Sequence, residues 1–358
     1  MEKLMIKSGF VNILKPTGMT SSDVVCKVKK ILGIKKVGHL GTLDPAASGV
    51  LPIALGKATK FFDYFLKKDK IYVADVVFGT LTDTLDSFGV VIQKDDVNIT
   101  LSDIEKVLGE FVGKIQQIPP KYSAIKINGK KACDLARMGQ DIEIAPREIE
   151  IYSIELLGEL KKNYFRFKVH CSSGTYIRTL FNDIAIKLNT VATTPVIIRT
   201  KSGVFEIDQS VTLDQLQGDK NPVSIECVFK NVTQINIEDE NLIKKLANGV
   251  KLTKSEFNCG VSGNFLISYE GRLIGMYHYE QNKIINQNHS FRDFGRDLLF
   301  ALFLRQLTCD QSRKSRFLVQ SGIGHFFLCV SFSDQILRRP LQNEKQHAEK
   351  KRRRNDPF

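Results

Sequence analysis

The chain has 358 residues, of which 42% are hydrophobic and 25% charged, and its formal net charge is +13. These values are typical of a soluble globular protein with room for two domain cores. The seven cysteines are scattered without a C-x-x-C pair, which excludes a zinc ribbon and a disulfide framework. No apolar run is long enough to cross a bilayer, and the first ten residues lack the apolar core of a signal peptide, so we expect a cytoplasmic protein. The basic excess favours a nucleic-acid partner, although about half of it lies after residue 291.

The first predicted elements are a short buried strand and a basic helix. Residues 10–15, FVNILK, favour a strand, and the turn PTGMTSSD then leads to a helix N-cap at Ser21 or Ser22. The following VVCKVKKILG places its apolar residues on one face and its lysines elsewhere, and Gly33 ends the helix. A basic helix face is either simply solvated or a contact for nucleic acid, and the pattern leaves both open.

Strands dominate the rest of the first 200 residues, so we expect a mixed α/β unit with few helices. Alternating apolar and polar residues indicate the strands, a period of 3.6 residues indicates the helices, and Asn-Gly favours a two-residue hairpin turn. The predicted elements are a strand from Lys70, a helix over 101–115 capped by Ser102, a hairpin at Asn128-Gly129, strands over 147–157 and 163–171, and a helix over 174–188.

A second, smaller unit is predicted from Glu206 to about residue 290. It has the size of a domain and contains a hairpin that turns at Glu270-Gly271. After this unit the sequence loses clear periodicity and ends in a basic run, KKRRR, which is either a solvated terminus or a nonspecific contact for nucleic acid. We expect this atypical basic tail, 291–358, to be poorly ordered and dispensable for catalysis.

Asp44 is the single charged residue in the stretch GHLGTLDPAASGVLPIALG, residues 38–56. Leu-Asp-Pro is itself a common helix start, with Asp as the N-cap and Pro at the first helical position. Against that interpretation, glycines surround the acid and let a ligand approach the backbone, and His39 and Thr42 add polar groups. A carboxylate in such apolar surroundings requires a cationic partner, for which arginine is best suited.

Arg178 is the candidate partner. The sequence CSSGTYIRTL places Tyr176 and Arg178 directly after a strand and a glycine, at the start of a predicted helix. A cation in the first helical turn is unfavourable for the helix dipole, which favours a specific acidic partner over a plain surface position. We therefore expect an ion pair between Arg178 and Asp44.

Five sequence motifs occur in order along the chain: ILKPTGMTSSDVV, GHLGTLDPAASGVLPIALGKATK, KIYVADVVFGTLTDTLDSFG, IPPKYSAIKINGKKA and CSSGTYIRTL. Together they resemble the TruB family of tRNA pseudouridine synthases. The resemblance covers residues 8–205 and continues more weakly to about residue 290. It implies a pseudouridine synthase catalytic fold, mixed α/β with a largely antiparallel sheet, over 8–205. A small β-rich, PUA-like RNA-binding domain would follow over 206–290.

The resemblance also implies the site residues and their roles. Asp44 stands where the family has its nucleophile, Tyr72 would stack on the flipped base and help take the C5 proton, and Arg178 would hold Asp44 charged and oriented. Without the resemblance, Tyr72 reads as a core aromatic residue and His39 as a local hydrogen bonder. The implied catalytic residues are thus Asp44, Tyr72 and Arg178, and the implied substrate-binding residues are His39, Tyr176 and Ile197.

Two local features depart from or compete with this interpretation. The family commonly has two consecutive arginines where this chain has Ile198 and Arg199, so we expect one contact with the RNA backbone to be missing. Asp83 and Asp86, in TLTDTLDSFG, suggest a metal loop, but no further acid or histidine completes an oxygen cage. We expect a polar turn there and no metal site.

The function implied by the resemblance is isomerisation of uridine 55 in the T-arm of tRNA. The N1–C1′ bond breaks and the base rejoins through C5 without redox change, so we expect no cofactor. The carboxylate would attack the ribose or the base, or remove a sugar proton, and the sequence leaves these open. Two rivals are a relative that modifies other RNA with a guide, and a catalytically inactive RNA-binding or tRNA-folding protein. We expect a monomer whose partner is tRNA, with no membrane and no obligate protein partner.

Overall fold

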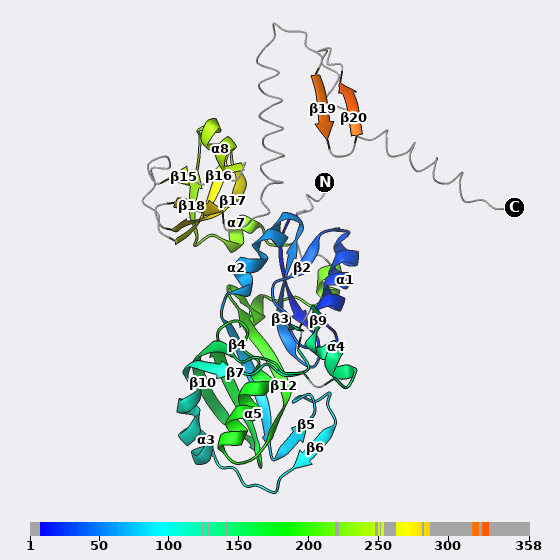
Figure 1. Cartoon of the computed structure of the whole chain (residues 1–358), viewed down its shortest axis with the longest axis vertical. Helices are drawn as coiled ribbons and strands as arrows, with labels where there is room; N and C mark the ends of the chain where they lie inside the picture. Colours follow the sequence, from blue (N-terminus) through cyan, green and yellow to red (C-terminus); the bar gives the residue numbers. More distant parts are fainter. Residues whose placement is uncertain are drawn as a thin grey trace, which may run out of the picture. The chain divides into compact units, whose positions relative to one another are not determined.

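The computed structural model describes residues 8–286, except 124, 128, 141, 219–221, 248–249, 251, 254–262 and 281–282, together with 317–321 and 324–328. The chain forms two compact units, Met1–Asp297 and Leu298–Phe358. Figure 1 shows the two larger sheets of the first unit, each with helices beside it, and the small hairpin of β5 and β6.

A nine-stranded sheet forms the core of the larger unit, in the order β1-β3-β12-β4-β11-β10-β7, with β2 paired to β3 and β13 paired to β12. β3 and β12 pair in parallel, and the other neighbours are antiparallel. The predicted mixed α/β fold with a largely antiparallel sheet is therefore confirmed. The strands are β1 (Gly9–Lys15), β2 (Val37–His39), β3 (Ser48–Leu55), β4 (Lys70–Phe78), β7 (Gly113–Gln117), β10 (Arg147–Lys161), β11 (Tyr164–Cys171), β12 (Ala192–Ser202) and β13 (Phe205–Glu206).

The three main helices lie near their predicted positions, but the helix predicted over 101–115 ends at Leu108, and residues 113–117 form β7 instead. Glycines at positions 109 and 113 weaken a longer helix. Two of the helices also have different N-caps. Thr20 and Thr100 are the caps, and each forms a capping box with the aspartate three residues later. The predictions of Ser21 or Ser22, and of Ser102, as caps are therefore wrong. The aspartate three residues after the cap accepts a hydrogen bond from the backbone N–H of the threonine. This second bond favours the threonine over the neighbouring serine as the cap. The helices are α1 (Ser21–Leu32), α3 (Leu101–Leu108) and α5 (Ile177–Lys187).

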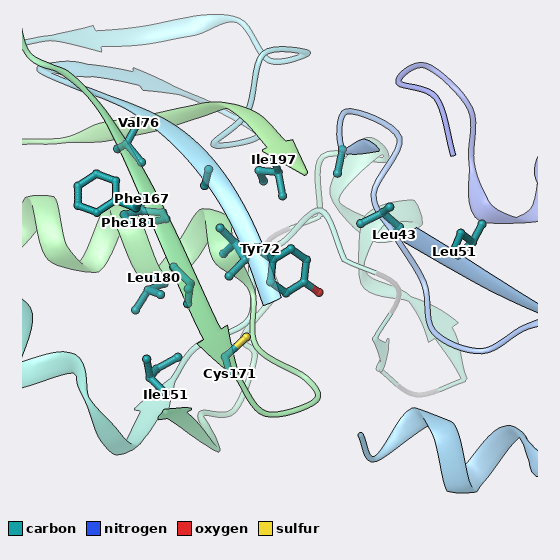
Figure 2. Close-up of a cluster of buried hydrophobic side chains, with 14 of the residues drawn as sticks. Leu43, Leu51, Tyr72, Val76, Ile151, Phe167, Cys171, Leu180, Phe181 and Ile197 are labelled. Carbon is teal, nitrogen blue, oxygen red and sulfur yellow. The ribbon is translucent and has the colours of Figure 1, made fainter. Parts of the chain in front are cut away.

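The main hydrophobic core lies where α5 packs against β12 and β4 and α3 packs against β10. Phe167 from β11 and Phe181 from α5 pack with their ring centroids 4.7 Å apart. Figure 2 shows Tyr72 from β4 beside Ile197, with its hydroxyl pointing away from Phe167 and Phe181. This core fixes β4 relative to α5, and these elements carry Tyr72 and Arg178.

A five-stranded sheet follows in the same unit, in the order β14-β16-β17-β18-β15. The predicted hairpin is present between β16 and β17, and its turn residues Glu270 and Gly271 have φ values of 47° and 71°. That this part is a PUA-like RNA-binding domain over 206–290 stays a prediction. The elements are α6 (Leu213–Gly218), α7 (Ile225–Val228), β14 (Thr233–Asn236), α8 (Glu240–Ala247), β15 (Leu252–Thr253), β16 (Gly263–Tyr269), β17 (Arg272–Glu280) and β18 (Lys283–Asn286).

Shorter elements complete the described chain. In the smaller unit β19 and β20 pair antiparallel, and the rest of the tail 291–358, including its expected disorder, lies outside the described residues. None of the described helices is long and apolar enough to cross a membrane. The short elements are η1 (Gly56–Phe61), α2 (Phe62–Leu66), β5 (Thr80–Thr82), β6 (Val91–Lys94), η2 (Gly109–Phe111), β8 (Lys126–Ile127), β9 (Lys130–Lys131), α4 (Ala132–Arg137), η3 (Ile207–Gln209), β19 (Phe317–Ser321) and β20 (Gly324–Leu328).

Candidate active site

Asp44 lies in the loop between β2 and β3, where the chain makes a turn. The backbone N–H of Ala47 donates to the Asp44 carbonyl at 3.1 Å, and β3 begins at the next residue, Ser48. The alternative that Asp44 caps a helix is therefore wrong, because the strand starts before a helical turn is complete. The Asp44 side chain is 33% exposed, whereas Leu43 and Ala47 are buried. The acid thus reaches solvent from an otherwise apolar loop.

Arg178 comes from the first turn of α5 and contacts Asp44 directly. Its Nη2 donates to Asp44 Oδ2 at 2.7 Å, and the arginine side chain is only 4% exposed. The same guanidinium donates to the carbonyl oxygens of Thr84 at 2.8 Å and Tyr122 at 3.1 Å. These bonds stabilise the buried charge and fix the direction from which it meets the carboxylate. The contact expected between Arg178 and Asp44 is present.

Asp86 is a second acid on the same arginine. Its Oδ2 lies 3.4 Å from Arg178 Nη1, and its side chain is 8% exposed. Its Oδ1 accepts from Thr84 Oγ1 at 2.7 Å and from the backbone N–H of Phe88 at 3.0 Å. The predicted turn is present, but this acid faces the interior and belongs to the Arg178 network. Within the described part of the chain, no group of three side chains could hold a metal ion.

The N-terminal motif anchors the Asp44 loop on both sides of the acid. Ser21 Oγ donates to the Leu43 carbonyl at 3.0 Å and accepts from the Leu43 N–H at 2.9 Å. The backbone N–H of Gly18 donates to the Pro45 carbonyl at 2.8 Å, and Lys15 Nζ reaches the same carbonyl at 3.4 Å. Burial lowers the pKa of Lys15 to about 8, while the nearby Asp44 charge opposes this shift. The residues that flank Asp44 are therefore both held in place.

Tyr72 on β4 is 8% exposed and is the register partner of Val169 and Arg199 on the neighbouring strands. Burial raises the pKa of Tyr72 to about 12, and the charge of Arg199 and a hydrogen bond with it act in the opposite direction. At pH 7 only about one phenol in 10⁵ is ionised at that pKa. The ring can stack on a base and the hydroxyl can donate a hydrogen bond. A role in taking the C5 proton requires that the bound substrate lower this pKa.

The three expected substrate-binding residues lie on β2, on β12 and at the start of α5. Burial, and then the charge of Arg199, lowers the pKa of His39, so its ring is neutral at physiological pH. Its Nδ1 has no hydrogen-bond partner among the described residues. Tyr176 is the N-cap residue of α5. Burial raises the pKa of its phenol, and the nearby Asp44 charge raises it further. Ile197 is 6% exposed and belongs to the apolar cluster that contains Tyr72.

Four residues that position the site are not among those predicted to act in it. Gln117 on β7 accepts from the Tyr176 N–H at 2.8 Å and donates to the Tyr176 carbonyl at 3.1 Å, which replaces a side-chain cap for α5. The other three are Ser21, Asp86 and Arg199. Two sequence signals could have identified two of these residues. The Thr20-x-x-Asp23 capping box makes Thr20 the cap and leaves Ser21 able to bond elsewhere, and Arg199 is a lone arginine in an apolar strand.

Comparison with known proteins shows which family the chain resembles. Residues 29–177 match the family described as "TruB family pseudouridylate synthase (N terminal domain)". The protein named tRNA pseudouridine synthase B from Caldanaerobacter subterraneus subsp. tengcongensis is 41% identical over 281 residues, which cover 78% of this chain and 98% of that protein. The protein of the same name from Staphylococcus haemolyticus is 39% identical over 302 residues, which cover 79% and 99%.

Solved structures extend the similarity to the fold. The crystal structure of a Cbf5-Nop10-Gar1 complex matches with a TM-score of 0.58 at 27% identity, covering 81% of this chain and 87% of that chain. An archaeal box H/ACA sRNP Nop10-Cbf5 complex matches with a TM-score of 0.57 at 27% identity, covering 82% and 89%. Identity near 40% over almost the whole length of the named relatives decides the assignment. The chain belongs to the TruB family of pseudouridylate synthases.

Proposed function

We propose that this enzyme converts uridine to pseudouridine at position 55 in the T-arm of tRNA. The observation that carries the proposal is the pair of Asp44 and Arg178, in which a buried arginine holds a partly exposed carboxylate on a loop. Relatives about 40% identical bear the name tRNA pseudouridine synthase B. The five ordered motifs support position 55 as the target. Because the substrate is tRNA, we place the enzyme in the cytoplasm.

The isomerisation detaches one uracil base from its ribose and reattaches it through a different atom. The target uridine first leaves its stack and enters the site. Asp44 then attacks the ribose or the base, or removes a sugar proton, and the N1–C1′ bond breaks. The base turns, C5 bonds to C1′, the C5 proton leaves and N1 takes up a proton, so the composition of the RNA is unchanged. No electron leaves the substrate, and side chains suffice for the proton transfers.

The other site residues support this step by position. Arg178 orients the Asp44 carboxylate, and Tyr72 offers a face on which the uracil ring stacks. Ile197, adjacent to Tyr72 in the cluster, supports the ring from the apolar side. The half-buried, neutral ring of His39 would contact the RNA beside the extruded nucleotide through its exposed part, since its Nδ1 is buried.

Two rival functions are less well supported. A guide-dependent enzyme is favoured by the fold similarity to Cbf5 complexes, but that identity is 27% against 41% for the tRNA enzyme from Caldanaerobacter. A protein that only binds or folds tRNA needs no buried arginine aimed at an acid, and here Arg178 and Asp44 are in contact at 2.7 Å. We propose that the enzyme acts as a monomer without an obligate protein partner.

Release of tritium from a tRNA transcript labelled at C5 of its uridines tests the proposal, because each isomerisation frees one C5 hydrogen. We expect release that plateaus at one tritium per tRNA with the purified chain alone. A matched transcript with cytidine at position 55 should release none. Equal release from both transcripts would overturn the choice of position 55, and no release from either would overturn the enzymatic function.

A further inference from the structure

Arg199 on β12 is a buried cation for which the reaction outlined above has no role. Its side chain is 1% exposed. Nε donates to the Val50 carbonyl at 2.8 Å, Nη1 to the Thr42 carbonyl at 3.0 Å and Nη2 to the Gly41 carbonyl at 3.3 Å. All three acceptors are neutral, and a buried charge that bonds neutral groups costs more free energy than an apolar side chain of similar size. Packing alone does not explain an arginine here.

The three carbonyls lie on both sides of Asp44 in the chain. Gly41 and Thr42 precede the acid, and Val50 follows it on β3. One planar guanidinium therefore holds both ends of the loop. The backbones are also in direct contact: β12 pairs in parallel with β3 at Arg199 and Gly49. A Cβ on Gly49 would lie 2.3 Å from the Arg199 carbonyl oxygen, so this close approach requires glycine.

The same arginine faces Tyr72. β12 lies between β3 and β4 in the sheet, and Arg199 and Tyr72 are register partners. The Arg199 charge lies close enough to the phenol to offset part of the effect of burial on its pKa. The Arg199 charge also lowers the pKa values of His39 and Lys15, although burial is the larger cause for both. Arg199 is thus close to Tyr72, His39 and Lys15 as well as to the Asp44 loop.

We propose that Arg199 is a positioning residue for the isomerisation: its guanidinium fixes the backbone of the Asp44 loop and the phenol of Tyr72 relative to each other, so that carboxylate and ring meet the same uridine. The inference rests on the proposed function. Arg178 sets the direction of the Asp44 carboxylate, and Arg199 sets the place of the loop that carries it. A misplacement of about 1 Å between reacting groups can cost about 100-fold in rate.

The test separates positioning from general stability with two variants and a matched control. Arg199→Lys keeps the charge and the stem but cannot reach three carbonyls and a phenol with one ammonium group. Arg199→Gln keeps a planar head with N–H donors and buries no charge. It is therefore expected to fold even if Arg199→Lys does not. The control is Lys70→Met, since Lys70 is 5% exposed and bonds the carbonyls of Leu66 and Lys68, outside the Asp44 loop.

Each protein is measured for melting temperature, for the tRNA dissociation constant and for the single-turnover rate at saturating tRNA. We expect the folded Arg199 variants to lose about 10-fold to 100-fold in rate while tRNA affinity stays within about threefold. Lys70→Met should lower the melting temperature and keep the wild-type rate. A double variant of Arg199→Lys with Tyr72→Phe should lose less than the product of the two single losses, because Arg199 acts partly through Tyr72.

Three results would overturn the proposal. They are a folded Arg199 variant with the wild-type rate, a loss that appears only as weaker tRNA binding, and an equal loss of rate in Lys70→Met. The wild-type enzyme in the same assay distinguishes a wrong proposed function from a wrong role for Arg199. If the wild type fails to form pseudouridine, the proposed function is wrong, and if it turns over normally beside fully active Arg199 variants, only the role of Arg199 is wrong.

Discussion

Three consecutive hydroxyl side chains at the start of α1 have different roles, and alanine substitutions separate them. Thr20 caps the helix, Ser21 is 4% exposed and exchanges two hydrogen bonds with the backbone of Leu43, and Ser22 is exposed. Ser21→Ala leaves a buried N–H and a buried carbonyl without these partners, at about 1–3 kcal/mol each, so the free energy of unfolding should fall by about 2–6 kcal/mol. Thr20→Ala should cost about 1 kcal/mol and Ser22→Ala less than about 0.5 kcal/mol.

Urea unfolding followed by circular dichroism measures these losses, and single-turnover pseudouridine formation measures the effect on the site. Because Leu43 precedes Asp44 in the loop, Ser21→Ala should also lower the rate about tenfold in the folded enzyme. Thr20→Ala removes a cap outside the loop and should leave the rate unchanged. If Ser21→Ala were no more destabilising than Ser22→Ala, or if Thr20→Ala lowered the rate as much as Ser21→Ala, the assigned role of Ser21 would be refuted.

Three further substitutions test the charges of the site and its helix. Arg178→Lys keeps the charge but loses the planar head that meets Asp44 and two carbonyls, so the rate should fall about 100-fold with tRNA affinity preserved, and a rate near wild type would count against the pair. Asp86→Asn removes the buried acid beside Arg178 and should lower both the rate and the melting temperature; an unchanged melting temperature would argue against a buried contact. Burial raises the pKa of Asp183 to about 6, so the folded state favours the neutral carboxyl group. This preference stabilises the fold fully below about pH 4, near the pKa of the unfolded chain. The stabilisation is lost as the pH rises through 6. Asp183→Asn should therefore raise the free energy of unfolding by about 1 kcal/mol at pH 8, after allowance for partial exposure, and by nothing at pH 4; equal differences at both values would contradict the reasoning.

β4, β10 and β11 were predictable because apolar and polar residues alternate along them. β7 was not, because its first residues lie within the helix predicted over 101–115. The helix starts were not, because serine and threonine are both good caps and the choice depends on an acid three residues later. Thr20 and Thr100 each have that acid. The capping serine expected at position 21 instead bonds a loop that is distant in sequence, a contact that local rules cannot show.

The site was predictable where residues break a local rule. Asp44 is a charge in an apolar loop, and Arg178 is a cation at the wrong end of a helix, so each requires a partner elsewhere. Asp86 breaks no such rule, since an acid in a polar turn is ordinary. Arg199 is a lone arginine in an apolar strand, but this signal does not identify the groups that it contacts. Their roles arise from the three-dimensional fold, which places β12 beside both β3 and β4 and brings the turn between β5 and β6 to α5.

The proposed chemistry depends on the charge of the Asp44 carboxylate, which Asp44→Asn removes. The amide keeps the shape of the side chain and removes only its charge, so the loop and the tRNA-binding surface should be retained. The decisive measurement is the single-turnover yield of pseudouridine at position 55, taken at a protein concentration shown by direct binding to saturate the tRNA. We expect tRNA binding close to wild type and no detectable pseudouridine, whereas substantial pseudouridine formation by Asp44→Asn would contradict the account.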